Sequence, residues 1–340
     1  MAKFSRSLKV TVLCVSWYLL STTNNILGKK ILVQYPYPLT ITLFHMLSSS
    51  FMVYPVLLMA GINTQYRYSK HFMLRFIIPL GFGKLFGSIA SHISIWRVTI
   101  SYAHTVKASL PIFTVLLGRL IYKDLQSYQV YLSLLPIVFG VAIATITELS
   151  FEFYGMCSAL LATFIFALQN LYSKLAIKEV RLHPLQMLVT ISQISLVICL
   201  PLWIFIDTPK MANDVNLHST ADQLDLLGRL SMSSFINFLQ SIVSFSVLHL
   251  LSPLSYSVAN ATKRVLVITV SLATLHNPVT LVNFFGMMLA VLGVYLYNRA
   301  KISQGTIKSI LPTTLNDQLS EKVSDSSPRY RAFIKSNTFI

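Results

Sequence analysis

The chain has 340 residues, of which 54% are hydrophobic and only 11% are charged, and its mean hydropathy is +0.65. Because soluble globular proteins carry roughly 25% charged residues, this composition excludes an ordinary soluble domain and predicts a chain that mostly faces lipid. The net charge of +16 does not indicate nucleic-acid binding, since the basic residues lie between apolar segments and near the C-terminus. The three cysteines lie inside apolar runs and provide no disulfide framework.

Ten apolar segments reach about 20 residues, the length that a helix needs to cross the hydrocarbon core. The first segment is too long for a signal peptide and lacks a small-residue cleavage site, so it is expected to act as a signal anchor. The predicted spans are 8–28, 38–60, 74–95, 98–121, 127–146, 152–173, 184–206, 230–251, 253–275 and 278–297. Residues 301–340 are rich in Ser, Lys, Asp and Thr, which predicts a disordered cytosolic tail.

The basic residues between the spans favour one side of the membrane. Eighteen of them fall on the side that holds both termini, and five fall on the other side. By the positive-inside rule, both termini are expected in the cytosol. The longest connector, about 207–229, contains four aspartates and is expected on the opposite, lumenal side.

Polar landmarks recur along the chain at offsets of 145 to 156 residues. Asn25–Lys29 resembles Asn170–Lys174, and Lys107 occupies the place that Lys263 has in the second half. We therefore predict one transporter domain built from two five-helix repeats. An odd number of spans in each repeat makes the second one enter the membrane inverted, which is typical of alternating-access carriers with a site at the midplane. The repeats are predicted to cover 1–147 and 148–300.

Four basic residues lie within predicted spans, whereas all eleven acidic residues lie outside the cores of the spans. Cations in hydrocarbon are unfavourable unless water or an anionic ligand compensates them, so their presence predicts an anion-binding site. For Lys107 and the adjacent pair Lys263 and Arg264, this interpretation is favoured over snorkelling. For Lys84, contact with water or a headgroup is an equally good interpretation, because Gly83 lies on a GxxxG face beside it.

Polar residues close to these cations are further candidates for substrate binding. They are His104, Thr105, Tyr256 and Asn260. His45 and His249 are interpreted as hydrogen-bonding groups within the bundle. The spans contain no carboxylate for proton coupling, which favours exchange of one anion for another or uncoupled flow. The sequence contains no metal-ligand cluster, nucleotide loop or nucleophile with its base, so we expect neither an enzyme nor a cofactor.

Several motifs resemble the triose-phosphate translocator family of the drug/metabolite transporter superfamily. They are Asn25–Ile31, Tyr35–Pro38, Ser101–Lys107 and Val258–Arg264. The second half, through Asn277–Thr280 and Tyr297–Arg299, is similar to the E1-type member of solute carrier family 35. The resemblance covers about residues 8–300. It implies ten helices in two inverted halves that exchange phosphorylated three- to six-carbon metabolites, often against inorganic phosphate.

Residue by residue, the resemblance implies a phosphate site at Lys107, Lys263 and Arg264, with a hydroxyl contributed by Ser91. These are the cations that the charge argument selects, and Ser91 is added to them. The organic part of the substrate is expected to be recognised differently from that of plastid members. Those members have a histidine in span three and a tyrosine in span eight, where this chain has Ser88 and Gln240.

The resemblance also matches Lys29 and Lys174 to basic positions near the two ends of the cavity. A symmetric gating role and simple solvation at a helix end remain alternatives for both residues. The predicted function is thus an antiporter of a small phosphorylated organic anion, such as a sugar phosphate or a three-carbon phosphate, in exchange for phosphate. Its expected partners are that anion and membrane lipid, and no nucleic acid.

Two other functions remain open. A nucleotide-sugar antiporter on the same fold would need a pocket for the base, which the sequence does not identify. A trafficking factor or scaffold that transports nothing does not explain why cations remain in hydrocarbon. The sequence has no transit peptide, which favours the endoplasmic reticulum or Golgi membrane over a plastid.

Overall fold

The computed structural model is a helical bundle and has no strand in the part of the chain that it describes. That part comprises residues 2–59, 61, 68–123, 125–180, 184–214, 217, 219–251 and 253–324. Nine helical segments of these residues are long and apolar enough to cross a membrane, which confirms the predicted polytopic all-α membrane fold.

Prolines and short interruptions divide several of the spans into more than one helical element. In the first half these elements are α1 (Ala2–Gln34), α2 (Pro38–Phe51), α3 (Val53–Met59), α4 (Lys70–Phe72), the π-helix η1 (Met73–Ile77), α5 (Ile78–Arg97), α6 (Ile100–Val106), the 3₁₀-helix η2 (Lys107–Ser109), α7 (Leu110–Tyr122), α8 (Tyr128–Leu132) and α9 (Leu135–Ile146). In the second half they are α10 (Phe153–Val180), α11 (Pro184–Ala212), α12 (Thr220–Leu250), α13 (Pro253–Leu275) and α14 (Leu281–Ser324).

The predicted eighth span, 230–251, lies in α12, which is not among the nine apolar segments. With 31 residues α12 is long enough to cross a bilayer. Its charged residues Asp222, Asp225 and Arg229 precede the predicted span, and the side chains at 245, 248 and 249 within that span lie outside the described residues. The count of ten spans therefore stays a prediction.

Most of the predicted connector 207–229 is helical. α11 continues to Ala212 and α12 begins at Thr220. Asp207 was expected in this connector, but it lies inside α11 and is buried. Its carboxylate accepts hydrogen bonds from the backbone N–H and the hydroxyl of Thr40, both at 2.9 Å. Thr40 lies in the first turn of α2, where free backbone N–H groups stabilise a negative charge.

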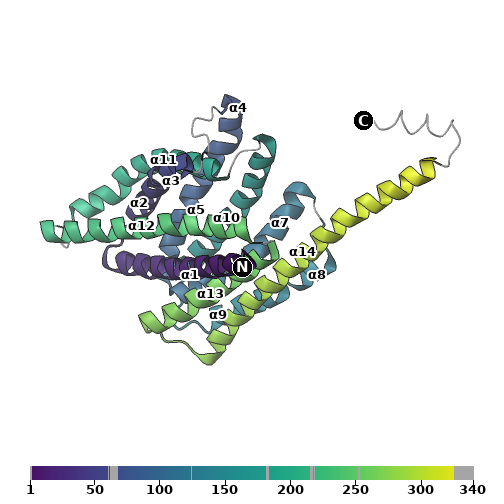
Figure 1. Ribbon diagram of the computed structural model, residues 1–340. Coiled ribbons are helices and arrows are strands. Elements are labelled where there is room, and N and C mark those ends of the chain that lie inside the picture. Colours follow the sequence, from purple (N-terminus) through teal and green to yellow (C-terminus); the bar gives the residue numbers. More distant parts are fainter. Residues whose placement is uncertain are drawn as a thin grey trace.

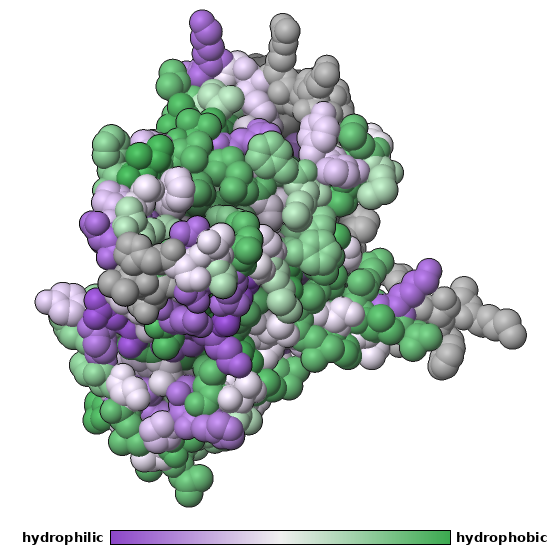
Figure 2. Space-filling model, turned by 90° about the vertical axis from the view of Figure 1, so that its left-hand side faces the viewer, coloured by the Kyte–Doolittle hydropathy of each residue, from purple (hydrophilic) through white to green (hydrophobic). Residues whose placement is uncertain are grey.

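The two sides of the bundle can be followed in Figure 1. The C-terminal part of α14 projects to the right, whereas the turns between α11 and α12 and between α13 and α14 lie to the left. Large hydrophobic side chains are exposed along the helices, as expected where lipid is the solvent. Examples are Leu19, Leu120, Phe139, Phe205 and Phe285. Hydrophobic residues cover much of the left-hand face, and hydrophilic ones gather in its middle and lower parts (Figure 2).

The closest helix crossing joins α9 and α14. A Cβ added at Gly140 would lie 2.3 Å from the backbone nitrogen of Ala290, and one at Gly293 would lie 2.7 Å from that of Ile137. Only glycine allows the two backbones to approach this closely. Gly140 of α9 and Gly293 of α14 therefore allow close contact at two points of the same crossing.

The most extensive helix contacts each join one element of residues 1–147 to one of residues 148–300. α5 packs against α10, α1 against α12, α2 against α11, and α9 against α14. The Gly83 and Gly87 face of α5 meets Ile165, Phe166 and Gln169 of α10. This is the helix contact that the GxxxG spacing predicts.

α14 remains helical up to Ser324, so the part of the predicted disordered tail from 301 to 324 is a helix in this structure. Residues 325–340 of that tail lie outside the described residues, as does the side chain of His249.

Candidate functional site

Polar side chains from both halves line a cavity of about 370 Å³ inside the bundle. The lining comes from α1, α2, α5, α6, η2, α10, α11, α12 and α13. Seven of the predicted site residues contribute to it, namely Lys84, Ser88, Ser91, His104, Lys107, Gln240 and Lys263. Residues spread over some 180 positions of the chain are thus brought to one place.

Lys107 occupies an interruption between α6 and α7. Pro111 has no N–H and cannot donate to the carbonyl of Lys107 four residues earlier, so the helix tightens into the 3₁₀ turn η2. The N–H of Leu110 donates to that carbonyl instead. The ammonium of Lys107 donates to the hydroxyl of Ser91 on α5 at 2.7 Å. This contact joins two residues of the predicted phosphate site.

Lys263 and Arg264 are neighbours on α13. The ammonium of Lys263 lies over the indole ring of Trp17, 4.3 Å from its centroid, in a cation–π contact. Trp17 in turn stacks on Tyr256, with centroids 5.6 Å apart. The guanidinium of Arg264 donates to the backbone carbonyl of His104 at 3.4 Å, although Arg264 does not line the cavity itself.

None of these cations forms an ion pair with a carboxylate in the part of the chain that the structure describes. The acceptors that they do have are a hydroxyl, a carbonyl and an aromatic ring. Neutral groups compensate a cation only partly in a medium of low dielectric constant. The cavity thus has the capacity to bind an anion.

Three histidines are oriented by neutral partners around the cavity. His104 is hydrogen-bonded to Asn25 at 3.0 Å. His92 is hydrogen-bonded to Thr42 at 2.7 Å. His45, which the sequence assigns to bundle hydrogen bonding, is paired with Ser233 at 3.0 Å. His45 and His92 also line the cavity.

Further lining residues were missed by sequence reasoning. They are Ser21, Asn24, Asn25, Ser49, Asn237 and Ser241. Their spacing carries a signal, since Asn237, Gln240 and Ser241 recur at the i, i+3, i+4 positions of one helix face. The carbonyl oxygen of Gln240 is buried and has no hydrogen-bond partner among the described residues, so it has the capacity to accept a hydrogen bond from a ligand.

Three other predicted residues do not line the cavity. The hydroxyl of Thr105 is buried and donates to the carbonyl of Ser101 at 2.9 Å. Tyr256 supports Trp17 from behind. Asn260 precedes Lys263 by almost one turn of α13 and remains outside the lining.

The two predicted gating lysines differ in their surroundings. The ammonium of Lys29 donates to the carbonyls of Trp96 and Val98, at 2.9 and 3.0 Å, at the C-terminal end of α5. A cation is stabilised there by the helix dipole. Lys174 is exposed and makes no hydrogen bond or ion pair with the described residues. The pair is therefore asymmetric in this structure.

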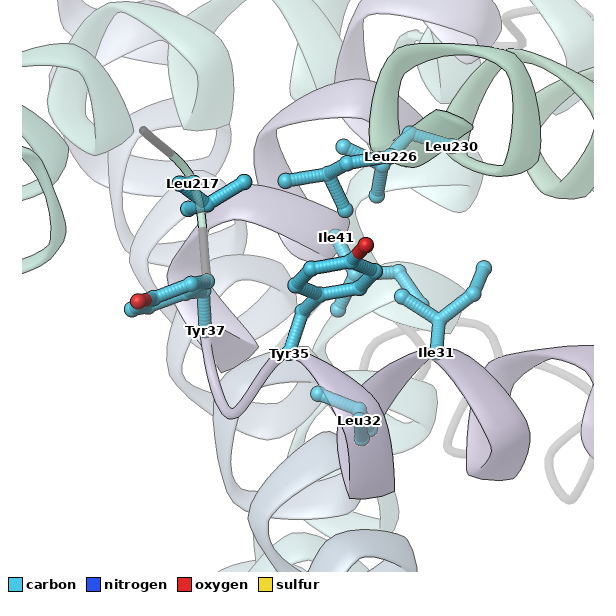
Figure 3. Close-up of a cluster of buried hydrophobic side chains, with 8 residues drawn as sticks. All are labelled: Ile31, Leu32, Tyr35, Tyr37, Ile41, Leu217, Leu226 and Leu230. Atoms are coloured by element: carbon cyan, nitrogen blue, oxygen red, sulfur yellow. The ribbon is translucent and has the colours of Figure 1, made fainter. Parts of the chain in front are cut away.

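Figure 3 shows a hydrophobic cluster that joins the end of α1 and the start of α2 to α12. Trp96, whose carbonyl accepts a hydrogen bond from Lys29, packs against this cluster. Tyr35 points toward Leu226 of α12, and Tyr37 lies beside Leu217. The phenol of Tyr37 also donates to the carboxylate of Asp214 at 2.5 Å. Burial and this carboxylate raise the pKa of Tyr37 above its usual range. The cluster fastens the turn between α1 and α2 to the connection between α11 and α12.

Comparison with known proteins gives a consistent family. The model of the Triose-phosphate Transporter family matches residues 8–298. Phosphoenolpyruvate/phosphate translocator 3, chloroplastic, of Oryza sativa subsp. japonica is 35% identical over 84% of this chain and 73% of its own length. Glucose-6-phosphate/phosphate translocator 1, chloroplastic, of Arabidopsis thaliana is 30% identical over 88% and 76%.

Two further matches are more distant. Putative transporter C83.11 of Schizosaccharomyces pombe is 28% identical over 88% of this chain and 68% of its own length. A solved structure titled "Crystal structure of protein" matches 88% of this chain and 98% of the other one, with a TM-score of 0.52. Its sequence identity of 13% limits that similarity to the fold.

Proposed function

Because the chain belongs to the triose-phosphate transporter family, we propose that it exchanges a small phosphorylated organic anion for phosphate across an internal membrane. Sugar phosphates and three-carbon phosphates are the substrates that fit this function. The family and the named relatives are transporters rather than enzymes, in agreement with the sequence-based expectation. The observation that carries the proposal is the group of uncompensated cations at one cavity.

In this proposal the phosphate binds between Lys107 and Lys263, with Ser91 and Arg264 completing its surroundings. Lys107 and Lys263 both line the cavity, and each ammonium has only one neutral partner in the described structure. A phosphate between them would replace these partners with charge-assisted hydrogen bonds. Arg264 follows Lys263 directly in the chain, and the carbonyl of His104 orients its guanidinium. This planar group matches the geometry of phosphate oxygens.

The organic part of the substrate would then face the neutral side of the cavity. Ser88, His104 and Gln240 line it, and Gln240 has an acceptor oxygen to spare. Hydroxyl groups of a sugar or a three-carbon chain are suitable donors to that oxygen. We do not assign Thr105, Tyr256 or Asn260 to the substrate, because none of the three lines the cavity and, unlike Arg264, none carries a positive charge that attracts phosphate.

We further infer that transport proceeds by alternating access between two inverted halves, 1–147 and 148–300. The pairings of α5 with α10 and of α1 with α12 support this, since a two-fold axis that exchanges the halves converts one pairing into the other. The pairings of α2 with α11 and of α9 with α14 are unchanged by such an axis.

The asymmetry of Lys29 and Lys174 supports a gating role for this pair. Lys29 is bound to the end of α5 beside the Tyr35 cluster, whereas Lys174 is exposed and makes no hydrogen bond to any residue that the structure describes. If both termini are cytosolic, as the basic residues favour, the closed side is lumenal and this is the cytosol-facing state. Release of Lys29 and capture of Lys174 would accompany the opposite state.

The compartment that we propose is the endoplasmic reticulum or Golgi membrane, and similarity to the E1-type member of solute carrier family 35 remains a prediction. Colocalisation of a fluorescently tagged chain with markers of both membranes tests the compartment. Protease protection of tags at the two termini tests the orientation.

The decisive experiment is exchange of labelled phosphate by the purified protein in liposomes preloaded with phosphate or sugar phosphates. Saturable uptake that requires a phosphorylated internal substrate is expected. Uptake that depends on an internal nucleoside monophosphate would favour a nucleotide-sugar antiporter. No uptake and no thermal stabilisation by any phosphorylated metabolite would overturn the proposal.

A further inference from the structure

A third lysine lines the cavity, at some distance from the proposed phosphate position. Lys84, Ser88 and Ser91 are at the i, i+4 and i+7 positions of α5, so all three lie on one helix face, and all three line the cavity. Seven residues of α-helix advance about 10 Å along the axis. Lys84 is therefore about two turns from Ser91, the partner of Lys107.

The ammonium of Lys84 has a neutral partner. It donates to the hydroxyl of Ser192, a buried residue of α11. That hydroxyl is fixed from the other side, because it donates its own proton to the carbonyl of Leu188 at 2.6 Å. Lys84 forms no ion pair in the described part of the chain. Its positive charge is thus positioned in the cavity but not neutralised.

A purely structural role for Lys84, as a link between α5 and α11, does not account for the charge. Gly81 lies one turn before Lys84 on α5, and its carbonyl already accepts a hydrogen bond from the hydroxyl of Ser195 on α11, at 2.8 Å. The Gly81 position also packs tightly against Ile194. These neutral contacts hold the two helices together, whereas a buried ammonium adds a cost unless an anion offsets it.

We propose, building on the phosphate exchange proposed above, that Lys84 and Ser192 form a second anion-binding position that determines substrate choice. The favoured substrate is a phosphate ester with a second anionic group at the far end of its carbon skeleton. Its phosphate binds near Lys107 and Lys263, and the second group binds Lys84. Neutral groups such as Ser88 lie between the two cationic ends and contact the carbon skeleton.

The test uses the full-length protein in liposomes and measures competition against labelled phosphate. Four unlabelled competitors are compared: inorganic phosphate, glucose 6-phosphate, 3-phosphoglycerate and fructose 1,6-bisphosphate. Only the last two have a second anionic group, a carboxylate and a second phosphate respectively. The variants are Lys84→Met, Lys84→Arg and Ser192→Ala, with Lys70→Met as a control, since Lys70 is exposed and outside the cavity.

In the unaltered protein, at least one of the two doubly anionic esters should compete better than glucose 6-phosphate. Lys84→Met should weaken that competitor about tenfold or more, because a charge-assisted contact is lost. Phosphate and glucose 6-phosphate should change about twofold or less. Lys84→Arg should restore most of the preference, and Ser192→Ala should lower it severalfold. The better competitor identifies the second group as carboxylate or phosphate.

Equal weakening of all four competitors by Lys84→Met would overturn the inference, because it would indicate a structural role. Retention of the preference in Lys84→Met would overturn it as well. If Lys84→Met does not fold, the Lys84→Arg and Ser192→Ala variants decide by the same ratios. Ligand-induced thermal shifts of the detergent-purified protein give a readout without transport. If the doubly anionic esters stabilise the protein preferentially but no phosphate exchange is measured, the proposed function fails and the second anion-binding position stands. If exchange is measured without this preference, the second position fails and the proposed function stands.

Discussion

Replacement of Lys107 by methionine should weaken phosphate binding and at the same time stabilise the empty protein. Methionine retains most of the side-chain length and volume, so the packing around η2 is disturbed little. The variant removes a cation whose one hydrogen-bond partner in the described part of the chain is the hydroxyl of Ser91, at 2.7 Å. A residue that is kept for ligand binding at the expense of stability should show these opposite effects.

The magnitudes follow from the contacts. A hydrogen bond to a charged group contributes about 1.5–3 kcal/mol, so the KM for phosphate should rise about 10- to 150-fold. Ser91→Ala removes a neutral hydroxyl and should raise this KM only about 2- to 13-fold. Because the two groups are in contact, the double variant should deviate from additivity by about 0.5 kcal/mol or more. Without phosphate, the Tm of Lys107→Met should rise by several degrees.

Initial rates of phosphate exchange in liposomes give the KM, and thermal unfolding followed by size-exclusion chromatography gives the Tm. Lys70→Met is the matched control, because it removes an exposed lysine outside the cavity and should change neither quantity. An unchanged KM together with a lowered Tm would refute the reasoning, since Lys107 would then be a structural residue.

Three further predictions concern the closed end, the α9–α14 crossing and a buried carboxylate. Lys29→Met removes the hydrogen bonds to the carbonyls of Trp96 and Val98 and should lower the Tm by several degrees. Lys30→Met replaces an exposed lysine and should leave the Tm unchanged. Equal Tm values for the two variants would show that the bonds of Lys29 do not stabilise the fold. Gly140→Ala places a Cβ against the backbone of α14 and should destabilise by about 1–3 kcal/mol. A Cβ added at Gly118 would have no neighbour within 4 Å, so Gly118→Ala should be neutral or slightly stabilising. A similar loss of stability in both variants would rule out the close approach of α9 and α14 as the cause. Burial raises the pKa of Glu148, so the folded protein binds its proton more tightly and stability should fall as pH rises from the unfolded pKa to the raised folded value. Glu148→Gln should abolish the decline of Tm with rising pH, and the control Glu179→Gln, at an exposed position, should preserve it. If Glu148→Gln shows the same decline, another group causes it.

The cations that we propose for phosphate binding were selected from the sequence by one general principle. A charge in hydrocarbon is expensive in any tertiary arrangement, so Lys107, Lys263 and Arg264 indicate an anion wherever they lie in space. The same principle could not decide about Lys84. The role of Lys84 depends on whether its side chain faces the lipid or the cavity. The packing of α5 against α10 and α11 determines this orientation, and it places Lys84 in the cavity lining.

Most of the neutral residues that line the cavity could not be predicted from the sequence. Asn24, Asn25 and Asn237 are uncharged, and helices tolerate such residues in many environments. Only the packing of α1 against α12 brings them to the cavity. The roles of Thr105 and Tyr256 could not be read from proximity in sequence either, because rotation around the helix turns these side chains away from the lining.

The sequence by itself determined that this protein is embedded in lipid, that it is helical, and that its spans carry cations without carboxylates among them. These properties depend on composition and on the length of apolar runs, which do not change with the arrangement of the helices. Tertiary structure decided which polar groups share the cavity, that Lys29 rather than Lys174 is hydrogen-bonded, and that Asp207 is buried at the start of α2. These contacts join residues far apart in the chain, and only close packing of the helices brings their atoms within hydrogen-bonding distance.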